Sequence, residues 1–221
     1  MPMIRGVIFD LDGVLLDSMC IWQDLGGQFL RIHGIAPEPG LSELLFSMSM
    51  EQGAQYLCRS YPLGMSPEAV AAGIQELLRD FYYNCVQPKP GAQALLKFLS
   101  TKRIPMAAAT SSPRSHVTHA LTRTGLISFL SLILTTSELS TSKHEPHIYM
   151  EAAKALGSTP AETLVLEDSL YALKTAKAAG FCTVGVWDPL GEPNQQALRS
   201  EACCYLTSLL EFPARWDELN K

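Results

Sequence analysis

Short apolar runs alternate along the chain with segments of helical periodicity. The apolar runs have the length of buried strands and cover Ile4–Phe9, Met106–Ala109, Leu132–Leu134, Thr163–Leu166 and Cys182–Val186. The helical segments are Gly91–Lys102, Pro113–Thr124, Pro146–Leu156 and Ser169–Ala179, and glycines suited to a helix C-terminus follow at 125, 157 and 180. Such alternation is typical of a parallel sheet covered by helices on both faces. The pattern predicts an α/β fold whose ligand site lies at the C-terminal ends of the strands.

One long helical stretch interrupts this alternation after the first predicted strand. Its periodicity predicts helices over Met19–His33, Leu41–Ser60 and Ser66–Asn84. An insert of about 70 residues is too long for a loop. We therefore expect an α/β core domain, residues 1–17 and 88–221, and a small helical cap domain, residues 18–87.

Composition and charge indicate a globular protein without a nucleic-acid or membrane surface. The chain has 221 residues, of which 47% are hydrophobic and 18% charged, as in an ordinary globular protein. Its net charge is −5, and Lys and Arg nowhere form a run longer than two. An extended basic surface for nucleic acid or an anionic membrane is therefore not expected. A small molecule held by a local site is the expected partner.

The cysteines and the N-terminal segment indicate a cytoplasmic protein. The six cysteines form no C-x-x-C pair, and scattered cysteines in a chain of this length fit a reducing compartment. The first ten residues lack the pattern of a signal peptide, and no uncharged stretch reaches the ~20 residues of a membrane helix. The pattern does not indicate the oligomeric state.

Acidic residues follow the first predicted strand directly. Asp10 and Asp12 alternate along extended chain, so both face the same side, and Gly13 permits a sharp turn after them. Taken alone, an acidic loop is an equally good interpretation of the pair.

Three further groups of polar residues follow later strands. Thr110 and Ser111 follow the second strand, Lys143 lies in a loop before a helix, and Glu167 and Asp168 follow another strand. Each has an ordinary interpretation by itself, as a helix N-cap or a surface lysine. The hydroxyls after the second strand, with the N-terminal amides of the next helix, could also hold a phosphoryl oxygen.

The order and spacing of these four groups resemble the four motifs of the haloacid dehalogenase (HAD) superfamily. The helical insert resembles the type-1 cap of that superfamily, and Leu166–Ser169 with Ala178–Gly180 resembles its phosphatase and β-phosphoglucomutase subfamily. The resemblance extends over roughly Met3–Leu210. It implies a Rossmann-like parallel sheet with a small all-α cap domain inserted after the first strand.

The resemblance also implies roles for individual residues. Asp10 would be the nucleophile that forms an aspartyl phosphate, and Asp12 the general acid/base. Thr110, Ser111 and Lys143 would bind the phosphoryl group. Mg²⁺ would be held by Asp10, the backbone carbonyl of Asp12, Glu167 and Asp168. Independently of the resemblance, clustered carboxylates repel one another, and a hard divalent cation removes that repulsion.

The second acid favours phosphate-ester chemistry, because dehalogenases of the superfamily lack an aspartate at the position of Asp12. Two motif positions depart from the family pattern. Lys143 is followed by His144 and His147 instead of Pro-x-Pro-Asp, and Ala172 replaces a glycine. The pairs His144/His147 and His116/His119 lack a third ligand, so neither is expected to bind metal.

The predicted cap bears on the reaction. β-Phosphoglucomutases carry a His and an Arg at the positions that correspond here to Trp22 and Met50, and Met48 is nearby. These side chains either form an apolar substrate surface or simply pack the helices. We expect a Mg²⁺-dependent phosphatase of a small phosphorylated metabolite. The alternatives are a sugar phosphomutase and a HAD-fold binding protein without turnover.

Overall fold

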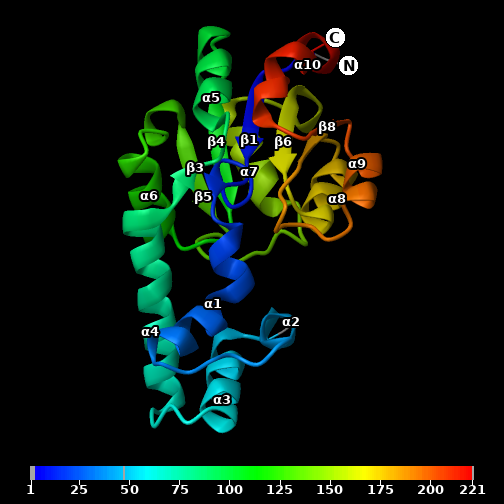
Figure 1. Cartoon of the computed structure of the whole chain (residues 1–221). Coiled ribbons are helices and arrows are strands. Elements are labelled where there is room, and N and C mark those ends of the chain that lie inside the picture. Colours follow the sequence, from blue (N-terminus) through cyan, green and yellow to red (C-terminus); the bar gives the residue numbers. More distant parts are fainter. Residues whose placement is uncertain (1–2, 47, 221) are drawn as a thin grey trace. The chain divides into compact units, whose positions relative to one another are not determined.

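The computed structural model describes residues 3–46 and 48–220, and its contacts divide the chain into two compact units (Figure 1). Met1–Met19 and Val86–Lys221 form the α/β unit, and Cys20–Cys85 forms the helical unit. The chain leaves the first unit after Met19 and returns to it at Val86.

The α/β unit contains a parallel sheet of six described strands. They are β1 (Gly6–Phe9), β4 (Met106–Thr110), β5 (Leu132–Thr135), β6 (Thr163–Glu167), β7 (Cys182–Val186) and β8 (Cys204–Leu206). Their spatial order is β5-β4-β1-β6-β7-β8, and every neighbouring pair is parallel. The predicted Rossmann-like fold class is confirmed. Strand β8 is absent from the prediction, since three residues carry too little periodicity to indicate a strand.

The central strand β1 lies where the direction of the chain through the sheet reverses. Phe9 is paired with Ala108 of β4 on one side and with Leu166 of β6 on the other. Because crossovers between parallel strands are right-handed, this reversal puts the helix between β4 and β5 and the helix between β6 and β7 on opposite faces. The reversal also leaves a crevice at the strand ends, which is where such sheets bind ligands.

The helices of the α/β unit match the predicted segments to within a residue or two. They are α5 (Ala92–Thr101), α6 (Arg114–Arg123), α7 (His147–Leu156) and α8 (Leu170–Ala178). Ile8, Ala107 and Val165 of the central strands pack against Ile148 and Tyr149 of α7 in one buried cluster. This packing anchors the strands whose ends carry the acidic residues.

Several elements of this unit were not predicted. They are the helices α9 (Gln195–Glu201) and α10 (Phe212–Leu219), the short helices η2 (Ile127–Phe129), η3 (Pro160–Glu162) and η4 (Leu209–Glu211), and the strands β2 (Leu16–Asp17) and β3 (Gln87–Pro88). Strands β2 and β3 pair antiparallel, so the segments by which the chain leaves and re-enters the unit lie side by side. Helix α10 contacts α5 through the rings of Phe98, Phe212 and Trp216.

The helical unit contains most of α1 (Met19–Ile32), then α2 (Leu41–Phe46), α3 (Met50–Ser60), α4 (Pro67–Asp80) and the π-helical turn η1 (Phe81–Cys85). Helix α1 is kinked at Asp24, whose backbone is not helical. The core of the unit consists of apolar side chains from all four helices and the segments between them: Phe29, Leu30, Leu41, Ala54, Leu57, Tyr61, Val70 and Ile74.

The prediction of one helix over Leu41–Ser60 was wrong. The structure has two helices there, and Ser47, which the predicted helix would include, lies outside the described residues. Ser49 has extended backbone angles, its hydroxyl accepts a hydrogen bond from the amide of Gln52, and the Gln52 side chain accepts one from the Ser49 amide. Local capping therefore overrides the apolar periodicity that runs across both helices.

Within the described residues, no helix is long and apolar enough to cross a membrane.

The capping of α3 gives a test in which the sign of the effect is informative. We expect Ser49→Ala to lower the free energy of unfolding by about 1 kcal/mol, because the cap hydrogen bond is lost. In a continuous helix the same change would stabilise the protein, since alanine is the better helix former. Urea denaturation followed by circular dichroism measures the difference, and the exposed Ser60→Ala serves as the control. A stabilised Ser49→Ala protein would contradict the capping.

Candidate active site

The predicted site residues lie at the C-terminal ends of three adjacent strands. Asp10 follows β1, Thr110 ends β4, and Glu167 ends β6. The amide of Asp10 donates to the carbonyl of Leu166 at 3.0 Å, which continues the pairing of β1 and β6 by one residue. All three side chains are buried. The sheet therefore positions a polar group at each of these strand ends in one place.

Lys143 lies between two of the carboxylates. Its Nζ is 2.6 Å from Oδ1 of Asp10 and 2.8 Å from Oε1 of Glu167. The lysine side chain is only 3% exposed, so its ammonium group exchanges water for these two oxygens. Tyr149 of α7 donates its hydroxyl to the same Glu167 oxygen at 2.7 Å. Tyr149 was not predicted as a site residue, because its position in α7 has the pattern of an ordinary core position.

Burial and neighbouring charges together shift the pKa values of Asp10, Asp168 and Lys143. Burial raises the pKa of Asp10 well above its usual value, although Lys143 opposes the shift. Burial and the charge of Glu167 raise the pKa of Asp168 to about 7. Burial alone would lower the pKa of Lys143, but the charges of Asp10 and Glu167 outweigh it and raise that pKa. Lys143 therefore stays an ammonium ion, while the carboxylates lack sufficient positive charge around them.

The acidic cluster suits a divalent cation. Ligand oxygens of Asp10, Glu167 and Asp168 all lie within 4.8 Å of one another. Oε2 of Glu167 is buried and has no hydrogen-bond partner among the described residues. When ionised, the three carboxylates against one ammonium group leave two negative charges in excess. An all-oxygen donor set with this charge fits Mg²⁺. The histidine pairs are not part of any such group of acidic and metal-ligating side chains in the described chain.

Two hydroxyl groups hold the carboxylate of Asp12. Ser18 donates to its Oδ1 at 2.6 Å, and Ser112 donates to its Oδ2 at 2.5 Å. Neither serine was singled out for this position from the sequence. Ser112 is adjacent to the predicted Thr110 and Ser111, so its place in the motif was the available signal. Both carboxylate oxygens are thereby oriented, as a positioned acid/base group requires.

The loop after β1 turns sharply enough to bring Asp12 back toward the sheet. Gly13 has a φ of 74°, and a Cβ at this position would collide with the carboxylate of Asp168. The carbonyl of Leu11 accepts the amides of Leu15 at 2.9 Å and Leu16 at 2.8 Å. Only glycine fits both the backbone conformation and the close contact with Asp168.

The predicted phosphate-binding residues differ in their surroundings. Thr110 is fully buried, and its hydroxyl accepts the amide of Ser112 at 3.0 Å. Ser111 is exposed. Pro113 occupies the N-cap position of α6, with no side-chain hydrogen bond there. The backbone around 110–113 is thus held by Thr110, while Ser111 remains accessible to solvent.

His144, which follows Lys143, packs against helix α8. The ring of His144 stacks on the ring of Tyr171 in α8, with centroids 4.4 Å apart. His144 also donates its amide to the Ser142 hydroxyl. These contacts join the loop that carries Lys143 to α8, so His144 contributes a contact where the family pattern has proline. His147 begins α7.

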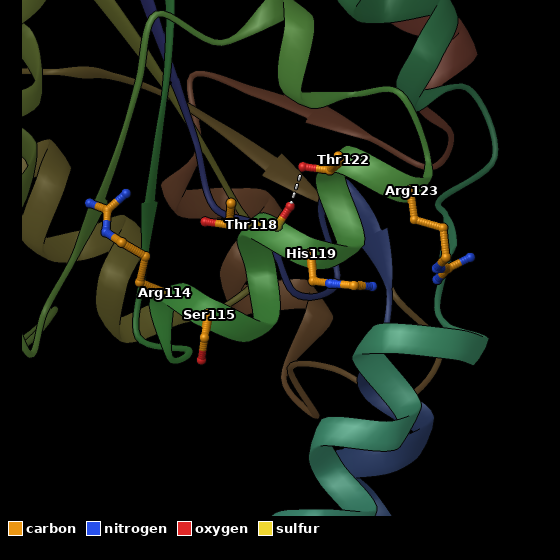
Figure 2. Close-up of a pocket in the computed structure, with 6 residues that line it drawn as sticks. All are labelled: Arg114, Ser115, Thr118, His119, Thr122 and Arg123. Atoms are coloured by element: carbon orange, nitrogen blue, oxygen red, sulfur yellow. Dashed lines mark hydrogen bonds between the residues drawn. The ribbon is translucent and has the colours of Figure 1, made fainter.

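A separate hollow of about 650 Å³ extends along α6 (Figure 2). Its lining residues are Arg114, Ser115, Thr118, His119, Thr122 and Arg123. Arg114 is paired with Glu138, and Arg123 donates to the carbonyl of Val86. No predicted site residue lines this hollow. The hollow along α6 is therefore a different place from the candidate active site at the strand ends.

The chain is similar to known proteins over most of its length. The family model for haloacid dehalogenase-like hydrolases matches residues 7–186. Hexitol phosphatase A of Escherichia coli (strain K12) is 30% identical over 192 residues, which cover 86% of each chain. Phosphorylated carbohydrates phosphatase of Thermotoga maritima is 25% identical over 178 residues, 80% of this chain and 82% of that one. A solved HAD family hydrolase from Deinococcus radiodurans R1, with bound phosphate and sodium, is similar in fold, with a TM-score of 0.77, 24% identity and coverage of 99% and 97%.

The family model spans every predicted motif, from the strand before Asp10 to the strand after Asp168. The relatives named above are phosphatases that match over most of their length. The chain belongs to the haloacid dehalogenase-like hydrolases and is a phosphoric monoester hydrolase of that family.

Proposed function

We propose that this protein is a Mg²⁺-dependent phosphatase that hydrolyses a small phosphorylated carbohydrate through an aspartyl phosphate on Asp10. The arrangement of Asp10 and Asp12 is the observation that carries the proposal. One carboxylate lies in a buried cluster against Lys143, and the other is oriented by two hydroxyls outside that cluster. Two carboxylates in such different surroundings are suited to two different roles.

In the first step, a carboxylate oxygen of Asp10 attacks the phosphorus atom of the substrate. The bond between phosphorus and the ester oxygen breaks, and Asp12 gives its proton to the leaving alcohol. Lys143 offsets negative charge on the transferring group. Thr110 holds the backbone that follows β4, and the accessible Ser111 supplies a hydroxyl to the phosphoryl oxygens.

In the second step, Asp12 takes a proton from a water molecule. The resulting hydroxide attacks the phosphorus of the aspartyl phosphate, the bond to Asp10 breaks, and inorganic phosphate leaves. Asp10 returns to a carboxylate, and Asp12 is again protonated, now with a proton from the water molecule. Each residue thus ends the cycle as it began.

The metal would be held by Asp10, Glu167, Asp168 and the backbone carbonyl of Asp12. The excess negative charge and the unpartnered oxygen of Glu167 support this set. When bound, Mg²⁺ supplies positive charge that lets an anionic nucleophile approach an anionic substrate.

The helical unit favours hydrolysis over phosphoryl return to a second phosphate ester. Trp22, Met48 and Met50 line one cavity of about 300 Å³ in that unit. Its lining among the described residues includes no Lys, Arg or His. A mutase needs cationic groups for the non-reacting phosphate of a bisphosphate intermediate. The names of the carbohydrate phosphatases among the relatives support a carbohydrate monophosphate as the substrate class.

Substitution of the nucleophile tests the covalent mechanism. We expect Asp10→Asn to abolish phosphate release, since an amide does not accept a phosphoryl group. Asp12→Asn should lower kcat by about 10²–10⁴-fold through loss of acid/base catalysis. Phosphate release from a panel of sugar and hexitol phosphates measures both, and the exposed Asp217→Asn is the matched control. More than a few per cent of residual activity in Asp10→Asn would exclude the covalent route.

The raised pKa of Asp168 predicts how stability depends on pH and metal. Its carboxyl has a pKa of about 7 in the folded chain and about 3.9 when unfolded. The folded state therefore binds the proton more tightly. Stability contributed by this group is present below pH ~4 and is lost as the pH rises through ~7. In chelator, we expect Asp168→Asn to melt several degrees above wild type at pH 8 and close to it at pH 4.

Mg²⁺ should reverse this effect in the wild type. We expect it to raise Tm at pH 8 more than at pH 5 and to leave Asp168→Asn nearly unchanged. Chelation should stop activity without unfolding the protein, because a chain of this size has a sufficient core of its own. Thermal melts over pH 4–8 with and without Mg²⁺ check both statements. An equal effect of Mg²⁺ on the variant would remove Asp168 from the metal site.

The balance between hydrolysis and isomerisation is a separate prediction. With β-glucose 1-phosphate as substrate, we expect phosphate release to exceed formation of glucose 6-phosphate, because Trp22 and Met50 stand where a mutase is expected to carry a His and an Arg. A phosphate assay run beside a coupled glucose 6-phosphate assay compares the two rates. Faster isomerisation would establish a mutase and refute the proposed hydrolytic outcome.

A further inference from the structure

Lys89 connects three segments around the candidate active site, although it belongs to none of the four motifs. It follows β3, where the chain re-enters the α/β unit. Its Nζ lies 2.6 Å from the carbonyl oxygen of Gly13 and 2.6 Å from Oδ2 of Asp188. The two side chains are 12% and 2% exposed, respectively. Lys89 and Asp188 therefore form an ion pair that is largely shielded from water.

Lys89 holds the loop after β1 at two points. Its side chain contacts the carbonyl of Gly13, and its backbone amide donates to the carbonyl of Leu15 at 2.9 Å. Gly13 follows Asp12 directly, so the position of its peptide group constrains the position of Asp12. No other lysine or arginine contact with the carbonyls of this loop is found in the described residues.

Asp188 is held by a backbone amide of its own loop. Its Oδ1 accepts the amide of Leu190 at 2.8 Å in the loop after β7. The next residue in that loop, Gly191, lies against the active site, since a Cβ there would be 2.9 Å from Oδ2 of Asp168. A Cβ at Gly13 would collide with the same oxygen. The two segments joined by Lys89 therefore flank one carboxylate of the acidic cluster.

We propose that Lys89 and Asp188 are a positioning pair, which holds the loop of Asp12 and Gly13 against Asp168 and so sets both the affinity for Mg²⁺ and the placement of the acid/base. This inference rests on the proposed function for the roles of Asp12 and Asp168. Neither Lys89 nor Asp188 touches the reacting atoms. Their contacts reach the site at the Gly13 carbonyl and at the loop after β7.

A purely structural role is the competing explanation, and buried ion pairs alone are weak evidence for either. The test therefore removes both charges together, so that no unpaired charge is left in the interior. In the double variant Lys89→Met/Asp188→Asn, the new amide oxygen still accepts the Leu190 amide. The exposed Lys97→Met in α5 is the matched control.

We expect the double variant to fold with a Tm within a few degrees of wild type. Isothermal titration with Mg²⁺ should show a Kd weakened by about 10-fold, the scale seen when partners behind metal ligands are removed. The kcat should fall about 10- to 100-fold through misplacement of Asp12, with the substrate KM within about two-fold. Lys97→Met should match wild type in all three.

An unchanged Kd and kcat in a folded double variant would overturn the proposal. If the double variant does not fold, Asp188→Asn decides, because it keeps the Lys89 contact with Gly13. An intermediate loss of Mg²⁺ affinity supports the positioning role, and wild-type values would leave only a folding role and so refute it. A wild-type protein that binds Mg²⁺ but releases no phosphate would refute the proposed function, while the Mg²⁺ titration still decides the role of Lys89.

Discussion

The ammonium group of Lys143 between Asp10 and Glu167 is the interaction on which the site depends. One buried ammonium lies 2.6 Å and 2.8 Å from these two carboxylates and supplies positive charge to both in a place where water is scarce. Removal of Lys143 would leave several acidic groups in mutual repulsion within the interior. Its charge is nevertheless insufficient for three carboxylates, and that deficit creates the demand for a divalent cation. The same buried negative charge thus requires Lys143 for stability and favours the binding of a divalent cation.

The parallel sheet makes this concentration of charge possible. Strands β4, β1 and β6 end together, and the rigid pairing of Phe9 with both neighbours fixes Asp10 between Thr110 and Glu167. Apolar packing beneath, from Ile8 and Val165 to Tyr149, supports the strand ends. The stability of the core therefore offsets the cost of assembling polar groups at its edge.

The two aspartates of the first motif acquire different surroundings within two residues. Asp10 continues β1 and is buried against Lys143, whereas the turn at Gly13 leaves Asp12 to the hydroxyls of Ser18 and Ser112. Burial raises the pKa of Asp10, and hydrogen bonds orient both oxygens of Asp12. A difference in environment, rather than in residue type, separates the nucleophile from the acid/base.

The sequence by itself determined five strands of the parallel sheet, most helices and the places of the motif residues at strand ends, because apolar periodicity and polar groups at strand ends are local signals. It could not distinguish one helix over Leu41–Ser60 from two, since the apolar pattern continues across the Ser49 cap. It also carried no sign of Tyr149 or the Lys89–Asp188 pair. These contacts join segments far apart in the chain, and each residue taken alone resembles an ordinary core, loop or surface position. Only the tertiary structure decided them, because strand order and loop path determine which distant side chains share one buried, poorly solvated space.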